Sequence, residues 1–140
     1  MKVRTLLSAV QDAQASGDIT AESPVFAVVR HETLPLDSLE AWYAVSIVQI
    51  ELNADEGFVV CIADSSDDAA DMTVAVLLSR LRKLPSQCLQ QDVHVALRGD
   101  LTIQEGAGDS LEVVDAYADE HGLGLMVWFD GYAKWRESNT

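Results

Sequence analysis

The sequence has few basic residues, and their scarcity limits its binding partners. Its 140 residues contain 9 Lys or Arg against 23 Asp or Glu, which gives a formal net charge of −14. Ten acids and no base lie between Arg30 and Arg80, and eight acids and no base lie in residues 100–130. Because nucleic-acid phosphates are bound by cationic side chains, we expect no direct contact with nucleic acid.

The sequence also lacks long apolar runs and is poor in cysteine. No apolar stretch approaches the ~18 residues needed to cross a bilayer, and Lys2 and Arg4 precede no signal-like segment. We therefore expect a cytoplasmic protein that does not contact membranes. Cys61 lies in an apolar segment and Cys88 in a polar one, which favours two free thiols over a disulfide.

The chain contains an internal similarity that predicts its architecture. Three pairs of segments match: 1–10 with 72–81, 24–30 with 92–98, and 47–64 with 113–130. The first pair shares five identities, and the offset falls from 71 to 68 to 66 between pairs but not within them. Length changes therefore fall between segments, where loops tolerate them.

Each copy reads as one helix followed by three strands. Thr73 can cap a helix with apolar residues on one face, and Pro85 stops it; Gly17 stops the helix of the first copy. We predict an α+β fold in which two α-β-β-β pseudo-repeats form an antiparallel sheet with the helices on one face. The expected single domain spans 1–140, with units at 1–66 and 72–130 and a tail at 131–140.

The third strand of each copy predicts burial on both faces. Residues 58–63 and 124–129 are apolar runs without alternation, which is typical of strands covered on both sides. Two helices can cover one face of the sheet, so the other face needs a further layer or a partner chain. This requirement predicts a homodimer.

The opening of the second copy carries a family resemblance. Residues 72–85, Met-Thr-Val-Ala-Val-Leu-Leu-Ser-Arg-Leu-Arg-Lys-Leu-Pro, are followed by Asp-Val-His-Val at 92–95. This pattern resembles the start of small uncharacterised proteins of bacteriophages and other mobile elements, which open with a Met-Thr-Val-x-x-Leu-Leu-x-x-Leu helix. The resemblance implies an accessory protein in a mobile element, and it carries over no functional residue.

The densest acidic cluster supplies the candidate binding residues: Asp64, Asp67, Asp68 and Asp71. It lies between the copies and lacks the ligand spacing, central glycine and terminal glutamate of a calcium loop. A polar linker explains it better than a metal site.

No motif predicts catalysis or a cofactor. His31, His94 and His121 have no metal-ligand spacing. Ser8 and Ser79 lie within predicted helices and lack the glycine-flanked turn of a serine nucleophile. Arg30 and Arg98 match each other at strand ends, where a structural pairing with a carboxylate is the simpler interpretation.

The leading hypothesis is a non-enzymatic, acidic accessory protein that binds another protein. One form of it is an inhibitor whose carboxylates mimic nucleic-acid phosphates and occupy the groove of a nucleic-acid-binding protein. The alternatives are a small-molecule-binding or catalytic protein with a cleft between the pseudo-repeats, and a purely structural oligomer. An acidic surface that serves solubility alone is the simplest interpretation of the charge.

Overall fold

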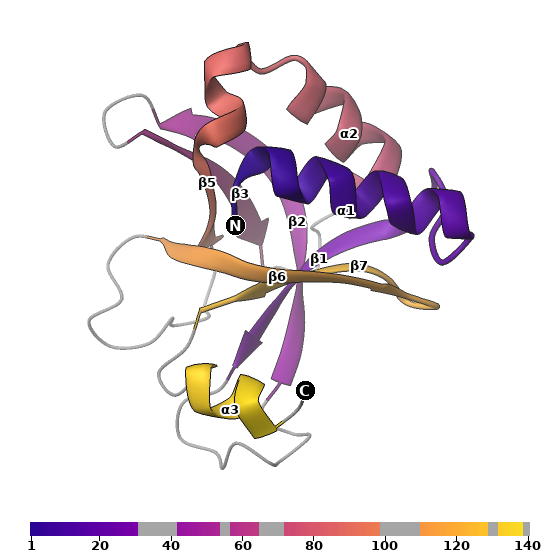
Figure 1. Ribbon diagram of the computed structural model, residues 1–140, viewed down its shortest axis with the longest axis vertical. Coiled ribbons are helices and arrows are strands. Elements are labelled where there is room, and N and C mark those ends of the chain that lie inside the picture. The colour runs from indigo at the N-terminus through magenta and orange to yellow at the C-terminus, as the bar shows by residue number, and fades with distance from the viewer. Residues whose placement is uncertain (31–41, 54–56, 65–71, 99–109, 129–131, 139–140) are drawn as a thin grey trace.

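The chain forms a mixed sheet with two helices packed together on one side (Figure 1). The computed structural model describes residues 1–30, 42–53, 57–64, 72–98, 110–128 and 132–138. The helices are α1 (Val3–Ser16), α2 (Val74–Arg82), the 3₁₀ helix η2 (Ser86–Gln90) and α3 (Tyr132–Ser138). The strands are β1 (Pro24–Arg30), β2 (Trp42–Asn53), β3 (Phe58–Asp64), β4 (Met72–Thr73), β5 (Asp92–Arg98), β6 (Leu111–Asp119) and β7 (Gly122–Val127). The predicted α+β class is confirmed.

The sheet is mixed, whereas we predicted an antiparallel one. Within each half, consecutive strands pair antiparallel: β1 with β2, β2 with β3, β5 with β6, and β6 with β7. Between the halves, β3 pairs parallel with β5, and β7 pairs parallel with β1. The segment between β3 and β5 contains α2, and a helical crossover returns the chain to the same end of the sheet. Because β2 pairs with both β3 and β1, six strands close into a cycle.

The two halves share several backbone features. The register shifts between Ile47 and Gln49 in β2 and between Val113 and Asp115 in β6, at positions related by the predicted offset of 66. At the start of each helix, the N–H of Val74 donates to the carbonyl of Ser23, and the N–H of Val3 donates to that of Gln91. Descent of the halves from a duplicated unit stays a prediction.

The ungapped alignment of the third strands is wrong by two residues. Four residues separate the paired Asn53 and Phe58 of β2 and β3, whereas two separate the paired Asp119 and Gly122 of β6 and β7. Phe58 therefore occupies the same position as Gly122, and not that of Gly124. Sequence similarity alone did not reveal this because both strands are apolar throughout.

The helix signals in the sequence are confirmed. The Thr73 side chain caps α2 by accepting from the N–H of Val76, and Arg80 and Arg82 lie in its last turn. Gly17 ends α1 with φ of 84°, a left-handed conformation that glycine adopts readily. The apolar faces of both helices join side chains from all six long strands in one core.

The second face of the sheet is already covered within the chain. Val28, Val60, Ile62 and Met126 point away from the helices and are each no more than 8% exposed. Burial on both faces of the third strands is therefore confirmed. The homodimer stays a prediction, but covering the second face of the sheet no longer requires a partner chain.

Three elements were not predicted. The expected tail contains α3, and β4 is a two-residue strand beside β1. η2 contains Cys88, which is buried and not in an exposed loop. Both cysteines are free thiols, as predicted.

Candidate functional site

The acidic cluster predicted as a binding site is represented by one described residue. Asp64 ends β3, where it lies opposite Arg98 of the parallel strand β5. Asp67, Asp68 and Asp71 lie outside the described residues. Among the residues that the structure describes, no three His, Cys, Asp or Glu side chains are grouped as metal ligands.

The histidines occupy separate places. The ring of His94 stacks on Phe58, with centroids 4.0 Å apart and planes 13° apart, and its Nδ1 lies 3.1 Å from the Oγ of Ser110. His121 lies in the β6–β7 turn with its Nε2 3.6 Å from a carboxylate oxygen of Glu120. His31 is outside the described chain. His94 thus packs against an aromatic ring of the neighbouring strand β3.

The candidate nucleophiles have no activating neighbours among the described residues. Ser8 and Ser79 are exposed on the helices. Cys61 is fully buried in β3, and desolvation raises the pKa of its thiol to about 12, so the reactive thiolate is disfavoured.

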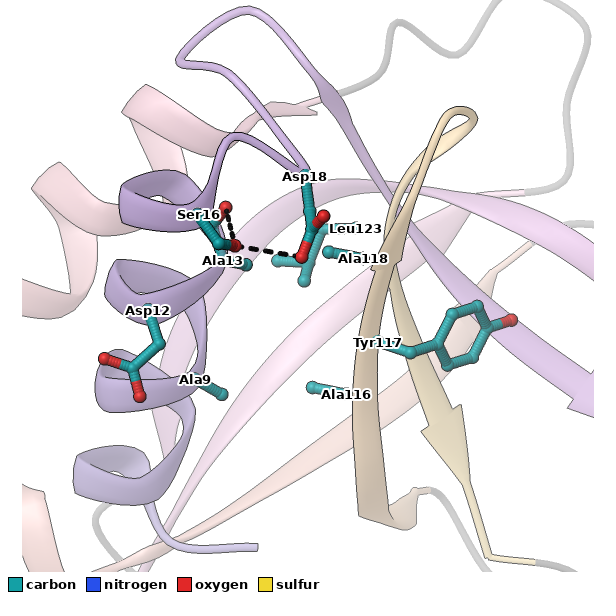
Figure 2. A pocket seen from close by; sticks show the side chains of 9 residues that line it. All are labelled: Ala9, Asp12, Ala13, Ser16, Asp18, Ala116, Tyr117, Ala118 and Leu123. Atoms are coloured by element: carbon teal, nitrogen blue, oxygen red, sulfur yellow. Dashed lines mark hydrogen bonds between the residues drawn. The ribbon is translucent and has the colours of Figure 1, made fainter. Parts of the chain in front are cut away.

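A groove lies between α1 and β6, two elements from opposite halves of the chain (Figure 2). This α1–β6 groove has a volume of about 360 Å³. It is lined by Ala9, Asp12, Ala13, Ser16, Asp18, Ala116, Tyr117, Ala118 and Leu123. Figure 2 shows that the strand alanines face the helix while the Tyr117 ring points to the other side of β6. Small side chains on both walls therefore leave the groove open.

A second hollow lies on the opposite face of β6. This β1–β6 hollow has a volume of about 480 Å³. It is lined by Pro24, Phe26, Ala44, Ser46, Tyr117, Asp119 and His121. A cleft between the two halves was one predicted alternative, and His121 is among the residues that line this hollow.

Carboxylates surround both sides of β6. Asp12 belongs to α1, and Asp18 directly follows the C-cap residue of that helix. Asp115 and Asp119 lie two residues before and two residues after Tyr117 on β6. All four are exposed, and no Lys or Arg is among the described residues that line either hollow. Burial raises the pKa of Tyr117, and the nearby charges of Asp119 and Asp115 raise it further.

The C-terminal end of α1 adds to this negative potential. Its last turn contains no basic residue, in contrast to α2, which has two. The partial negative charge of the helix end therefore lies beside Asp18 without a compensating cation on the helix. Asp18 accepts a hydrogen bond of 2.9 Å from the hydroxyl of Ser16, which fixes the carboxylate at this end of the groove.

The sequence contained a partial signal for this site. Asp115, Tyr117 and Asp119 recur at every second residue, the spacing of one face of a strand. The contribution of α1 was not predictable, because Asp12 lies more than 100 residues away in the sequence and meets β6 through packing of the halves.

No protein-family model matches the chain, and no curated protein or solved structure is significantly similar to it. In the part of the chain that the structure describes, every helix is too short or too polar to cross a membrane.

Proposed function

We propose that this protein is a non-enzymatic cytoplasmic accessory protein that binds a cationic protein partner through the carboxylates around β6. The partner class that fits best is a nucleic-acid-binding protein, whose phosphate-binding groove the carboxylates would occupy. The observation that carries the proposal is the gathering of carboxylates on both faces of β6: Asp12 and Asp18 line the α1–β6 groove, and Asp115 and Asp119 lie on the opposite face of the strand. No Lys or Arg is among the described residues that line either hollow.

The physical basis is electrostatic complementarity. A net charge of −14 repels nucleic acid and attracts basic surfaces over distances of about a Debye length, ~8–10 Å at moderate salt. Charges on a rigid helix and strand present a fixed pattern, which adds specificity to the attraction. The Lys and Arg residues of the described chain are at the start of α1, at the ends of β1, α2 and β5, and on α3.

The rival function is small-molecule binding in the β1–β6 hollow. Its volume of about 480 Å³ falls within the range of ligand pockets. The rings of Phe26 and Tyr117 would supply an apolar wall, and Ser46, Asp119 and His121 would supply polar groups. A structural oligomer is the third candidate, and a monomer in sedimentation equilibrium at micromolar concentration would exclude it.

The test is affinity capture from the native host with two matched variants. One changes Asp12, Asp18, Asp115 and Asp119 to Asn, and the other changes Asp64, Asp67, Asp68 and Asp71 to Asn. Both remove four carboxylates, so they alter the net charge equally and differ in location. Asn also retains an acceptor oxygen for the hydrogen bonds that Asp18, Asp115 and Asp119 make.

We expect the unmodified protein to retain a basic protein that high salt or added DNA releases, and the first variant to lose it. Loss in the second variant alone would move the binding site to residues 64–71. Retention by both variants, or retention that high salt does not weaken, would refute the electrostatic proposal.

A further inference from the structure

β6 has an edge that is paired along part of its length. It pairs with β7 from Val113 to Asp119, but with β5 through Leu111 and Glu112 alone. On the side away from β7, no strand in the described chain pairs with residues 114–119. An open strand edge presents backbone donors and acceptors that can pair with another chain.

The register identifies the backbone groups on this open edge. Asp119 faces Gly122 across a two-residue turn, and the residues that flank such a turn form a hydrogen-bonded pair. Hydrogen-bonded pairs alternate along an antiparallel ladder, so the backbone groups of Asp119, Tyr117 and Asp115 point to β7. The N–H and C=O groups of Ala116 and Ala118 then point the other way. The N–H of Ala116 is bonded to the Oδ1 of its neighbour Asp115 at 2.9 Å, as expected for a donor that β7 does not reach.

The N-terminus of the chain already occupies the beginning of this edge. The amino group of Met1 donates to the carbonyl of Val113 at 2.8 Å and to the Oε1 of Glu112 at 3.1 Å. On its other side, the carbonyl of Met1 accepts from the N–H of Val93 in β5 at 2.8 Å. A cationic extended residue thus bridges β5 and β6, and it stops there because α1 begins at Val3.

We propose that the remaining edge of β6 accepts an extended Lys- or Arg-rich segment of the partner as an added strand in the α1–β6 groove. This inference rests on the proposed function and specifies its partner. Main-chain hydrogen bonds to Ala116 and Ala118 would supply affinity, as in other cases of strand addition. The carboxylates would select basic side chains.

The surroundings of the edge support a basic segment on both of its faces. Side chains of an added strand alternate between the two faces of the sheet. Those on the helix side would cross Ala116 and Ala118, which leave room for long aliphatic stems, and reach Asp12 and Asp18. Those on the other side would lie near Asp115 and Asp119.

A second copy of this chain fits the edge poorly. Pairing two β6 edges would bring Asp115, Asp119 and Glu120 of both copies together, and like charges facing each other across strands are destabilising. The same acids that repel a second copy attract a basic segment.

The test uses a fluorescent heptapeptide of alternating Lys and Thr, with its anisotropy measured on the full chain at low salt. Two further peptides carry N-methyl groups on alternate residues, one set on odd positions and one on even positions. Since an added strand turns one set of N–H groups to β6 and the other to solvent, we expect one methylated peptide to bind about tenfold more weakly and the other to bind normally. A peptide with Glu in place of Lys should not bind.

Protein variants provide the matching evidence. Ala118→Pro removes an edge N–H and should weaken the Lys-Thr peptide about tenfold. Ala118→Gly keeps the N–H and adds no side-chain atoms to the groove, so its affinity for the peptide should stay well above that of Ala118→Pro. The methylated peptides keep the test decisive if Ala118→Pro fails to fold.

Equal effects of both methylation patterns, or no effect of either, would overturn strand addition. The proposed function would survive that result if the unmodified protein captured a basic partner and the variant with Asn at Asp12, Asp18, Asp115 and Asp119 did not. Conversely, peptide binding with the expected pattern, but with no partner captured, would refute the proposed function alone. A dimer that Ala118→Pro dissociates would identify a second copy as the occupant and overturn the proposal.

Discussion

Gly124 lies under two aromatic rings, and adding one methyl group there tests the packing around Tyr117. A Cβ at this position would lie 2.8 Å from Tyr117 Cζ, 3.0 Å from Tyr117 Cε2 and 3.1 Å from Phe26 Cε2. Such overpacking costs about 1–3 kcal/mol, while replacing Gly by Ala recovers about 0.4–1 kcal/mol from the unfolded chain. We expect Gly124→Ala to lower the free energy of unfolding by about 1–2 kcal/mol.

Urea unfolding followed by circular dichroism measures this change. With a denaturant slope of about 2 kcal/mol per M, the midpoint should fall by roughly 0.5–1 M. The control is the same substitution in a Tyr117→Ala background, where the two shortest contacts are absent and the cost should shrink by about 1 kcal/mol. A Gly124→Ala protein as stable as the unmodified one, or an equal cost in both backgrounds, would refute the reasoning.

Four further predictions concern the thiols and the helix ends. The folded chain holds the Cys61 proton more tightly than the unfolded chain, because burial raises the pKa of the thiol from 9.0 to about 12. The free energy of unfolding should therefore fall as pH rises from about 9 to 12. The fall should be smaller in the Cys61→Ala variant. Cys61 and Cys88, both buried, should react with a thiol reagent at the rate of unfolding, and fast labelling of either in the native protein would contradict its burial. Thr73→Ala should lower the free energy of unfolding, measured in urea, by about 1 kcal/mol because the α2 cap is lost. Thr73→Ser keeps a capping hydroxyl and should leave the free energy of unfolding close to that of the unmodified protein. Asp18→Asn removes a negative charge beside the C-terminal end of α1, so it should stabilise the fold by about 0.3–1 kcal/mol at low salt and raise the midpoint of thermal unfolding. A lower midpoint would contradict this electrostatic argument.

Local signals explain which elements were predictable. The boundaries of α2 follow from Thr73, its apolar face and Pro85, all within 13 residues of sequence. By contrast, β4 consists of Met72 and Thr73, and it exists because their backbones pair with β1. α3 could not be predicted because its seven residues are too few for a clear apolar periodicity.

The candidate site was less predictable than the fold. Acidity pointed to the segment from Asp64 to Asp71 because adjacent acids are conspicuous in sequence. The acids around β6 come from α1, from the residue after its C-cap and from β6 itself, and they are close together only because α1 packs across the opposite half of the chain. Sequence spacing contains no information about such a contact.

The sequence by itself determined the element order α-β-β-β in each half, the faces of both helices, the double burial of β3 and β7, and the negative charge. These properties depend on residues a few positions apart, whose spacing matches the period of a helix or strand. Tertiary structure alone decided that β3 runs parallel to β5 and β7 to β1, and that six strands close into a cycle. It also decided that, within the described residues, no strand pairs with the outer edge of β6 from residue 114 to 119. These features depend on how the crossover connections place one half against the other, which is a property of the packed core.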